Sequence, residues 1–185
     1  MPRIVAGTAR GRRLAVAPGD RVRPTSDRAR EGLFNTLATL VDLPGARFAD
    51  LYAGSGAVGL EALSRGAEHV LLVDSDPVAA RVLKANVDVV GLPGAEIVRS
   101  SVEGVVDAIA GEPYEVVFLD PPYAIRNDAL TDLVRGISER GWLATTGVCV
   151  VERPSRGEPF RWPPGLIADR HRRYGEGTLW YGFGS

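Results

Sequence analysis

The chain of 185 residues has few of the residues from which disulfide frameworks and metal centres are built. Its single cysteine, Cys149, excludes an internal disulfide, and two histidines, His69 and His171, are too few for a histidine-built zinc centre. No apolar run approaches the roughly 20 residues of a membrane-spanning helix, and the first residues lack the apolar stretch of a signal peptide. We therefore expect a cytoplasmic protein that neither binds a metal nor enters a membrane.

Lysine is also nearly absent, since Lys84 is the only one among 22 basic residues. The arginines gather at the start of the chain, where residues 1–30 carry eight of them against two acidic side chains. Residues 31–150 carry 8 basic and 17 acidic side chains, so the net charge of −1 conceals a basic arm on an acidic body. Such an arm is typical of a surface that faces a polyanion, although solvated charge runs are also common.

The composition is that of an ordinary globular protein, with 45% hydrophobic and 24% charged residues. Five apolar runs predict strands, at residues 47–51, 69–73, 96–99, 114–119 and 147–151. Helical spacing and capping signals predict helices at residues 57–65, 77–90, 101–109 and 130–137. The second of these helices has an apolar face formed by Val78, Val82, Ala85 and Val89. Strands that alternate with helices in this way indicate a parallel sheet covered on both faces.

The two ends of the chain depart from this alternation. Two last strands, around residues 166–173 and 178–183, are joined by Tyr174–Gly177 with no helix between them, so they should pair antiparallel. Near the start, Arg3–Ala6 and Arg12–Val16 flank a glycine-bounded turn, which predicts a small hairpin. A helix is expected from Asp27 to Val41, with Thr25 or Ser26 as its N-cap. Its inward residues are Leu33, Leu37, Leu40 and Val41.

These elements predict an α/β fold of the Rossmann-like type. Its seven-stranded, mostly parallel sheet ends in an antiparallel C-terminal hairpin, and a small β-hairpin and a helix extend it at the N-terminus. We divide the chain into a basic arm, residues 1–24, and the α/β domain, residues 25–185.

A glycine-rich loop follows the first predicted strand. Gly54, Gly56 and Gly59 satisfy G-x-G-x-x-G between a strand and a helix, a pattern typical of cofactor-binding loops. The pattern alone does not separate a dinucleotide from S-adenosylmethionine, and a turn that binds nothing also fits it. Asp50 favours S-adenosylmethionine, because a carboxylate beside this loop would repel a diphosphate and attract an ammonium or a sulfonium. Asp74, which ends the second strand, is placed to accept both ribose hydroxyls of either cofactor. Asp76 is the second candidate for this role, because Pro77 after it already marks the start of a helix.

The fourth predicted strand ends in Asp120-Pro121-Pro122-Tyr123. In a doubly wound sheet the ligand crevice lies at the carboxyl ends of the strands, so this tetrapeptide should open beside the glycine loop. The two prolines remove two N–H donors and leave carbonyl acceptors, which together with the Asp120 carboxylate suit an exocyclic amino group. Tyr123 offers a flat surface on which a base can stack, an interaction of about 1–3 kcal/mol. A rigid turn is the simpler interpretation, but the preceding glycine loop favours the functional one.

Several other functions are compatible with these residues. The same chemistry would serve adenine N6 in DNA or RNA, or a glutamine amide in a protein. An NAD-dependent oxidoreductase is disfavoured by Asp50 and by the lack of an obvious catalytic His or Lys near the strand ends. Cys149 lies in an apolar strand, which disfavours a cysteine-nucleophile pyrimidine methyltransferase. A non-enzymatic RNA-binding module is disfavoured because Asp50, Asp74 and Asp120 are all present.

The glycine loop, Asp74 and the Asp120–Tyr123 motif resemble those of class I S-adenosylmethionine-dependent methyltransferases that act on amino groups. Residues 3–14 (RIVAGTARGRRL) and 23–35 (RPTSDRAREGLFN) are similar to segments of the RsmD family, and the likeness extends to the terminal strands. Enzymes of this family methylate the exocyclic N2 of one guanine in bacterial 16S ribosomal RNA. The resemblance implies a class I methyltransferase fold, S-adenosylmethionine as cofactor and S-adenosylhomocysteine as product.

The resemblance also implies a set of site residues. The residues expected to bind the cofactor are Asp50, Tyr52, Gly54, Ser55, Gly56, Asp74, Ser75, Ser101 and Val102. The residues expected to hold the guanine are Asp120, Pro121, Pro122 and Tyr123. The residues expected to contact RNA are Arg3, Arg10, Arg12, Arg13, Arg23 and Thr25. The implied partner is 16S ribosomal RNA, within the 30S subunit or a late assembly intermediate, and we expect the protein to act as a monomer.

Overall fold

The structure, a computed structural model, describes residues 1–19, 26–108 and 110–185. Arg23 and Thr25, two of the residues expected to contact RNA, lie outside this range. The helices are α1 (Asp27–Leu37), α2 (Ala57–Ser64), α3 (Pro77–Val90), α4 (Val102–Val106) and α5 (Asn127–Glu139). The strands are β1 (Arg47–Leu51), β2 (His69–Asp74), β3 (Ala95–Arg99), β4 (Tyr114–Leu119), β5 (Leu143–Pro154), β6 (Leu166–Tyr174) and β7 (Gly177–Gly184).

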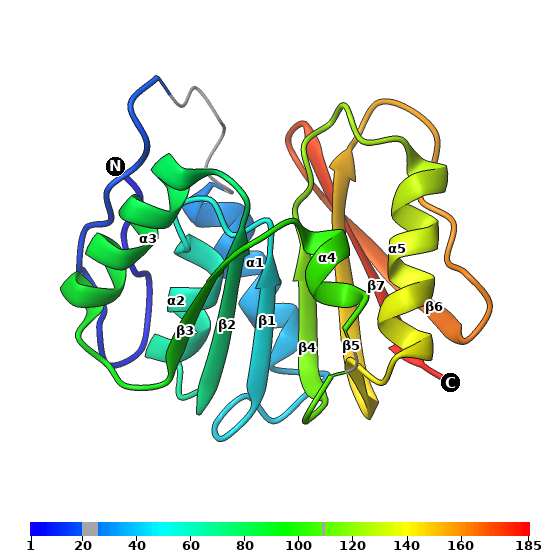
Figure 1. Ribbon diagram of the computed structural model, residues 1–185, viewed down its shortest axis with the longest axis horizontal. Helices are drawn as coiled ribbons and strands as arrows, with labels where there is room; N and C mark the ends of the chain where they lie inside the picture. Colours follow the sequence, from blue (N-terminus) through cyan, green and yellow to red (C-terminus); the bar gives the residue numbers. More distant parts are fainter. Residues whose placement is uncertain (20–25, 109) are drawn as a thin grey trace.

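The strands form one seven-stranded sheet in the order β3-β2-β1-β4-β5-β7-β6. The first five strands of the chain are parallel, and β7 pairs antiparallel with both β5 and β6. In Figure 1, α4 and α5 lie in front of the sheet, and α1 and α2 lie behind it. The predicted Rossmann-like fold with an antiparallel C-terminal hairpin is therefore confirmed.

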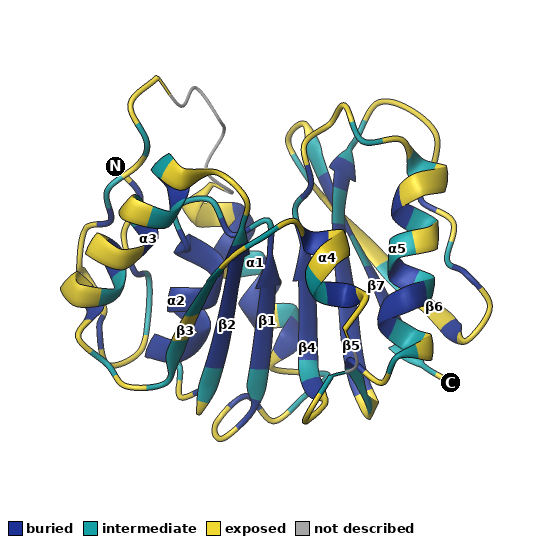
Figure 2. Ribbon diagram, in the orientation of Figure 1, coloured by how far each residue is buried: buried dark blue, intermediate teal, exposed yellow. Residues whose placement is uncertain are grey.

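Successive side chains of the central strands point alternately into two hydrophobic cores, one on each face of the sheet. Phe48 and Phe118 face the core shared with α1, α2 and α3, whereas their neighbours Ala49 and Leu119 face the core shared with α4 and α5. Cys149 is fully buried in the second core, as expected of a packing residue. Figure 2 shows the central strands buried along most of their length.

The strand register aligns the carboxyl ends of the parallel strands. Leu51, the last residue of β1, pairs with Val73 of β2 and with Leu119 of β4, and Leu119 pairs with Val151 of β5. The residues that follow these pairs are Tyr52, Asp74, Asp120 and Glu152. These four residues therefore lie in a row across the carboxyl edge of the sheet, where β1, β2 and β4 end and β5 continues to Pro154.

Three helices differ from the predictions. The face of α3 that packs on the sheet carries Ala79, Leu83, Asn86 and Val90, whereas Val89 of the predicted face is 47% exposed. Both faces have apolar residues at helical spacing, so the sequence pattern did not distinguish them. Helix α1 begins after its N-cap, Ser26, and ends at Leu37. Beyond it the chain forms a turn, in which the N–H groups of Thr39 and Leu40 bond to carbonyls three residues earlier. Helix α4 is shorter than predicted and ends at Val106.

The N-terminal arm forms the predicted hairpin only in a reduced form, with one antiparallel bridge between Arg3 and Arg13. Hydrogen bonds from the N–H of Ile4 to the carbonyl of Arg12 (2.9 Å) and from the N–H of Gly11 to the carbonyl of Ile4 (2.8 Å) close the turn. Ile4 and Leu14 are fully buried in the core that α1 and α2 share. The described part of the arm is therefore packed onto the α/β domain.

Among the described residues, no helix is long and apolar enough to cross a membrane.

Candidate active site

A cavity of about 730 Å³ lies at the carboxyl edge of the sheet, a volume typical of small-molecule and cofactor sites. It is lined by the ends of β1, β2 and β4, by the starts of α3 and α4, and by Glu152 of β5. Of the residues expected to bind the cofactor or the base, those in the lining are Tyr52, Gly54, Asp74, Ser75, Ser101, Val102, Asp120, Pro121, Pro122 and Tyr123. The structure therefore brings both predicted motifs to one cavity.

The three loop glycines have different physical roles. Gly54 has a φ of 55°, and a Cβ added there would meet nothing within 4 Å, so the backbone borders open space in the cavity. Gly56 is the left-handed N-cap of α2, with a φ of 79°. A Cβ on Gly59 would lie 2.5 Å from the Leu72 side chain, so this glycine allows α2 to approach the sheet closely. Gly56 and Gly59 shape the loop without lining the cavity.

Asp74 organises the loop through both of its carboxylate oxygens. Oδ2 accepts a hydrogen bond from the N–H of Gly54 (2.9 Å), and Oδ1 accepts one from the N–H of Asp76 (2.9 Å). Each carboxylate oxygen has a second lone pair, so acceptor capacity remains toward the cavity. Asp76 itself caps α3 by accepting from the N–H of Val78.

Asp50 lies beneath the glycine loop and does not line the cavity. Its side chain is buried, and its Oδ2 accepts a hydrogen bond from the N–H of Gly59 at 2.8 Å. Burial raises the pKa of Asp50 to about 8, the charges of Asp120 and Asp74 add to the rise, and the Gly59 hydrogen bond opposes it. Asp50 therefore supports the loop from behind. Ser55 also lies outside the cavity lining, and its carbonyl accepts from the Asn86 side chain.

Tyr52 is held in a strained backbone conformation directly after β1. Its φ of 69° is unusual for a residue with a side chain, and such strain is concentrated at functional sites. The Tyr52 hydroxyl lies 3.4 Å from a carboxylate oxygen of Glu103, and burial raises the pKa of Tyr52 above its ordinary value. Ser101, the N-cap of α4, uses its hydroxyl to accept from the N–H of Gly104 at 3.1 Å.

Two acidic residues of the cavity were not predicted as site residues, Glu103 and Glu152. A prediction of Glu152 as a site residue would have required the register of β4 with β5, which places Glu152 beside Asp120. With Asp74, Asp76 and Asp120, these residues give the lining five carboxylates and, among the described residues, no Lys or Arg. This concentration of negative charge favours a cationic ligand and disfavours a diphosphate.

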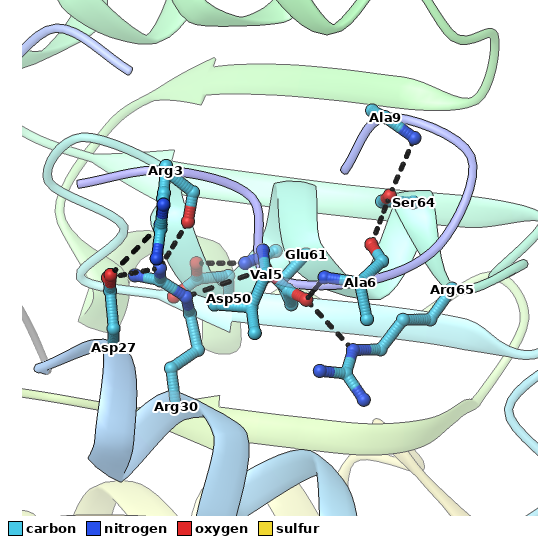
Figure 3. Close-up of polar contacts among 11 residues, drawn as sticks. Arg3, Val5, Ala6, Ala9, Asp27, Arg30, Asp50, Glu61, Ser64 and Arg65 are labelled. Carbon is cyan, nitrogen blue, oxygen red and sulfur yellow. Dashed lines mark hydrogen bonds and ion pairs between the residues drawn. The ribbon is translucent and has the colours of Figure 1, made fainter. Parts of the chain in front are cut away.

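The arm is fixed to α2 by the carboxylate of Glu61, which is fully buried (Figure 3). Its oxygens accept hydrogen bonds from the N–H groups of Val5 (2.8 Å) and Ala6 (2.9 Å). They also pair with the Nε of Arg65 at 2.9 Å and with the Nε of the buried Arg30 at 3.5 Å. One buried acid thus joins the arm, α1 and α2.

The residues expected to contact RNA have unequal freedom to do so. Arg10 and Arg13 are exposed, and Arg3 is exposed although its Nε lies 3.6 Å from Asp27. Arg12 is also exposed, but it donates from Nη1 to the carbonyls of Val89 and Val90 and thereby caps the end of α3. Replacing Arg12 would therefore disturb the domain as well as any RNA contact.

The fold and the acidic cavity at its carboxyl edge define a class I methyltransferase. A family model described as Conserved hypothetical protein 95 matches residues 2–182. The chain belongs to this family, the RsmD family.

Relatives and solved structures agree with this assignment. Ribosomal RNA small subunit methyltransferase D of Escherichia coli K12 is 39% identical over 150 residues, which cover 81% of this chain and 73% of the relative. The Bacillus subtilis protein YlbH is 35% identical over 176 residues, 94% of each chain. The solved structure of Escherichia coli yhhF superposes with a TM-score of 0.85 at 34% identity and covers 99% of this chain and 97% of that one. A hypothetical protein of Thermus thermophilus, TTHA0928, gives a TM-score of 0.81 at 38% identity, with 98% of each chain covered.

Proposed function

We propose that this protein transfers a methyl group from S-adenosylmethionine to the exocyclic N2 of a specific guanine in small-subunit (16S) ribosomal RNA. The observation that carries the proposal is the acidic cavity in which the glycine loop faces Asp120-Pro121-Pro122-Tyr123. Two features support the substrate: the exposed arginines of the arm, and the relative named as a ribosomal RNA small subunit methyltransferase.

The residues of the cavity fit S-adenosylmethionine, which carries an α-ammonium and a sulfonium and no phosphate. Gly54 leaves open space beside the loop, and Asp74 retains acceptor capacity for two ribose hydroxyls. Ser75 and Val102 complete the wall around that position. When bound, S-adenosylmethionine supplies an electrophilic methyl group next to the Asp120 loop.

The Asp120 loop would then activate a nitrogen that is a poor nucleophile, because the lone pair of an exocyclic amine is delocalised into the ring. The Asp120 carboxylate and the carbonyl of Pro121 hold the two amino hydrogens and favour pyramidal geometry at nitrogen, whereas the carbonyl of Pro122 accepts from the N–H of Ile125 at 3.0 Å. Tyr123, 39% exposed, provides the surface on which the guanine stacks. As the N–C bond forms, the methyl–sulfur bond would break and its electron pair would remain on the sulfur of S-adenosylhomocysteine. One amino hydrogen would leave as a proton, and Asp120 is placed to accept it. In-line positioning supplies most of the rate enhancement.

The basic arm would act as a phosphate clamp through Arg10 and Arg13, because Glu61 holds it rigidly beside α2. The substrate is 16S ribosomal RNA within the 30S subunit or a late assembly intermediate, and a single chain carries the whole site. Adenine N6 or a glutamine amide would fit the same acceptor array, and the test below separates these acceptors.

The test is transfer of a labelled methyl group to naked 16S ribosomal RNA, to 30S subunits, to DNA and to protein, followed by identification of the product by mass spectrometry. The proposal predicts N2-methylguanosine in ribosomal RNA. Asp120→Ala should abolish turnover and leave cofactor affinity, measured by calorimetry, nearly unchanged. Asp132→Ala, at an exposed position of α5, is the matched control and should retain full turnover. Methylated adenine, methylated protein, or retained turnover in Asp120→Ala would refute the proposal.

A further inference from the structure

A second cavity, of about 430 Å³, opens beside the acidic one. One of its walls is the chain from Tyr123 to Asp128, and the other is formed by Arg153, Pro154 and residues 156–158. Tyr123 and Ile125 line both cavities, so the two adjoin at the surface on which the base is proposed to stack. We call this second space the arginine cavity.

The arginine cavity differs in charge from its neighbour. Its lining contains Arg126, Arg153 and Arg156 against Asp128 and Glu158. Arg126 is paired with Asp128 through contacts of 3.2 and 2.9 Å, so their charges offset each other. Arg156 is exposed and also lines an adjacent hollow that contains Arg173 and Glu176. The side of Tyr123 that faces away from the acidic cavity is therefore suited to an anion.

Arg153 is the feature that points to a ligand. Its side chain is buried, with the residue only 6% exposed. Nε donates to Oδ1 of Asn127 at 2.9 Å, and Nη2 donates to the carbonyl of Ile125 at 2.6 Å. The charge of Asp120 in the acidic cavity acts on the guanidinium, but Nη1 is buried without a hydrogen-bond partner in the part of the chain that the structure describes. A charged donor left without an acceptor is costly, so an acceptor supplied by a ligand would complete the site.

The start of α5 adds a second source of positive potential to the same cavity. This helix has 13 residues, and the side chain of its N-cap residue Arg126 makes no capping hydrogen bond, whereas Asp128 in the first turn accepts from the N–H of Ala129 at 2.8 Å. Asn127 and Asp128, its first two residues, line the cavity. Free N–H groups and the helix dipole make such an N-terminus favourable for a phosphate.

We propose that the arginine cavity binds a backbone phosphate of the RNA strand next to the target guanine, with Arg153 and Arg156 as its cationic residues. This inference rests on the proposed function, since the guanine would stack on Tyr123 between the two cavities. Arg153 donates to the phosphate from Nη1, and Arg156 approaches it from the solvent side. Contacts of this kind fix the register of the strand, so that one particular base enters the acidic cavity.

The test is the salt dependence of binding to naked 16S ribosomal RNA, measured by filter binding. Arg156→Ala, which removes an exposed side chain, should flatten the slope of log Kd against log salt by about 0.7–0.9, the value for one lost phosphate contact. Arg153→Gln should flatten the slope by the same amount, and a thermal melt first checks that this variant is folded. Glu158→Gln should tighten binding several-fold, because it removes a negative charge from the site. Arg135→Ala, at a position paired with Asp132 on α5, is the control and should leave the slope unchanged.

Wild-type slopes in both Arg156→Ala and Arg153→Gln, or weaker binding in Glu158→Gln, would overturn the inference. Loss of S-adenosylmethionine affinity in Arg153→Gln would also overturn it, because Arg153 would then shape the acidic cavity. A different result would refute the proposed function itself: a wild-type protein that neither binds nor methylates ribosomal RNA. A wild-type protein that methylates guanine while these variants bind normally would refute the arginine cavity alone.

Discussion

Replacing Glu61 by alanine should destabilise the protein more than most single substitutions, because this carboxylate is fully buried and has four partners. It accepts from two backbone N–H groups of the arm at 2.8 and 2.9 Å and pairs with Arg65 at 2.9 Å and with Arg30 at 3.5 Å. The side chain of Arg30 is also fully buried, so Glu61→Ala leaves a buried cation whose remaining contacts are the half-exposed Asp27 and the carbonyl of Arg3. Breaking a buried pair in this way costs about 3–5 kcal/mol.

The assay is urea unfolding of the variant and the wild type, compared at the same pH. Glu61→Gln keeps an acceptor oxygen and should lose less, about 1–3 kcal/mol. Glu31→Ala, at an exposed position of α1, is the control and should stay within about 0.5 kcal/mol of wild type. In Glu61→Ala, trypsin should also cleave the arm at Arg10 or Arg13 faster than in wild type. A loss below about 1 kcal/mol together with unchanged proteolysis would refute the reasoning, since it would mean that the arm is held by its apolar contacts alone.

Three further predictions follow from the loop and the arm. Gly59→Ala should lower the free energy of unfolding in urea by about 1–3 kcal/mol, because the new Cβ would lie 2.5 Å from Leu72. Gly111→Ala is the control, because a Cβ there meets open space. Equal stability of the two variants would contradict the prediction. The pKa of Asp50 is raised to about 8, so the unfolded chain ionises first and this group lowers stability as pH rises from about 4 to 8. The free energy of unfolding of Asp50→Asn minus that of wild type should therefore grow by about 1 kcal/mol per pH unit over that range and then level off. If this difference does not change with pH, the raised pKa is excluded. The double variant of Arg10 and Arg13 to alanine should flatten the salt slope of RNA binding by about 1.4–1.8 if each contacts one phosphate, whereas an unchanged slope would show that the arm does not touch the RNA backbone.

The sheet and its two motifs could be predicted from the sequence because their signals are local. The strands are apolar runs between clear breaks, and the glycine loop and the Asp120–Tyr123 motif each occupy one connection. Strand order then follows from the usual topology of doubly wound sheets, which places both motifs at one edge. The position of the Asp120–Tyr123 motif beside the glycine loop could therefore be predicted from the sequence.

The features that could not be predicted depend on contacts between distant segments. Glu61 has the sequence environment of an ordinary helix acid, and only the return of the arm onto α2 makes it buried. The sequence predicts Arg12 as an RNA contact, but its guanidinium donates to the carbonyls at the end of α3. The buried face of α3 was misassigned because both of its apolar stripes fit helical spacing. Glu152 depends on the pairing of β4 with β5, which residue types alone do not specify.

The central claim is that the acidic cavity accepts the cationic methyl donor and presents it to an amino group held by the Asp120 loop. A crystal structure of the protein soaked with S-adenosylmethionine tests this claim most directly. The account predicts the ribose hydroxyls on Asp74, the adenine near Ser101 and Val102, and the methyl group directed toward Asp120 and Tyr123. Density for the donor outside this cavity, or a methyl group directed away from the Asp120 loop, would contradict it.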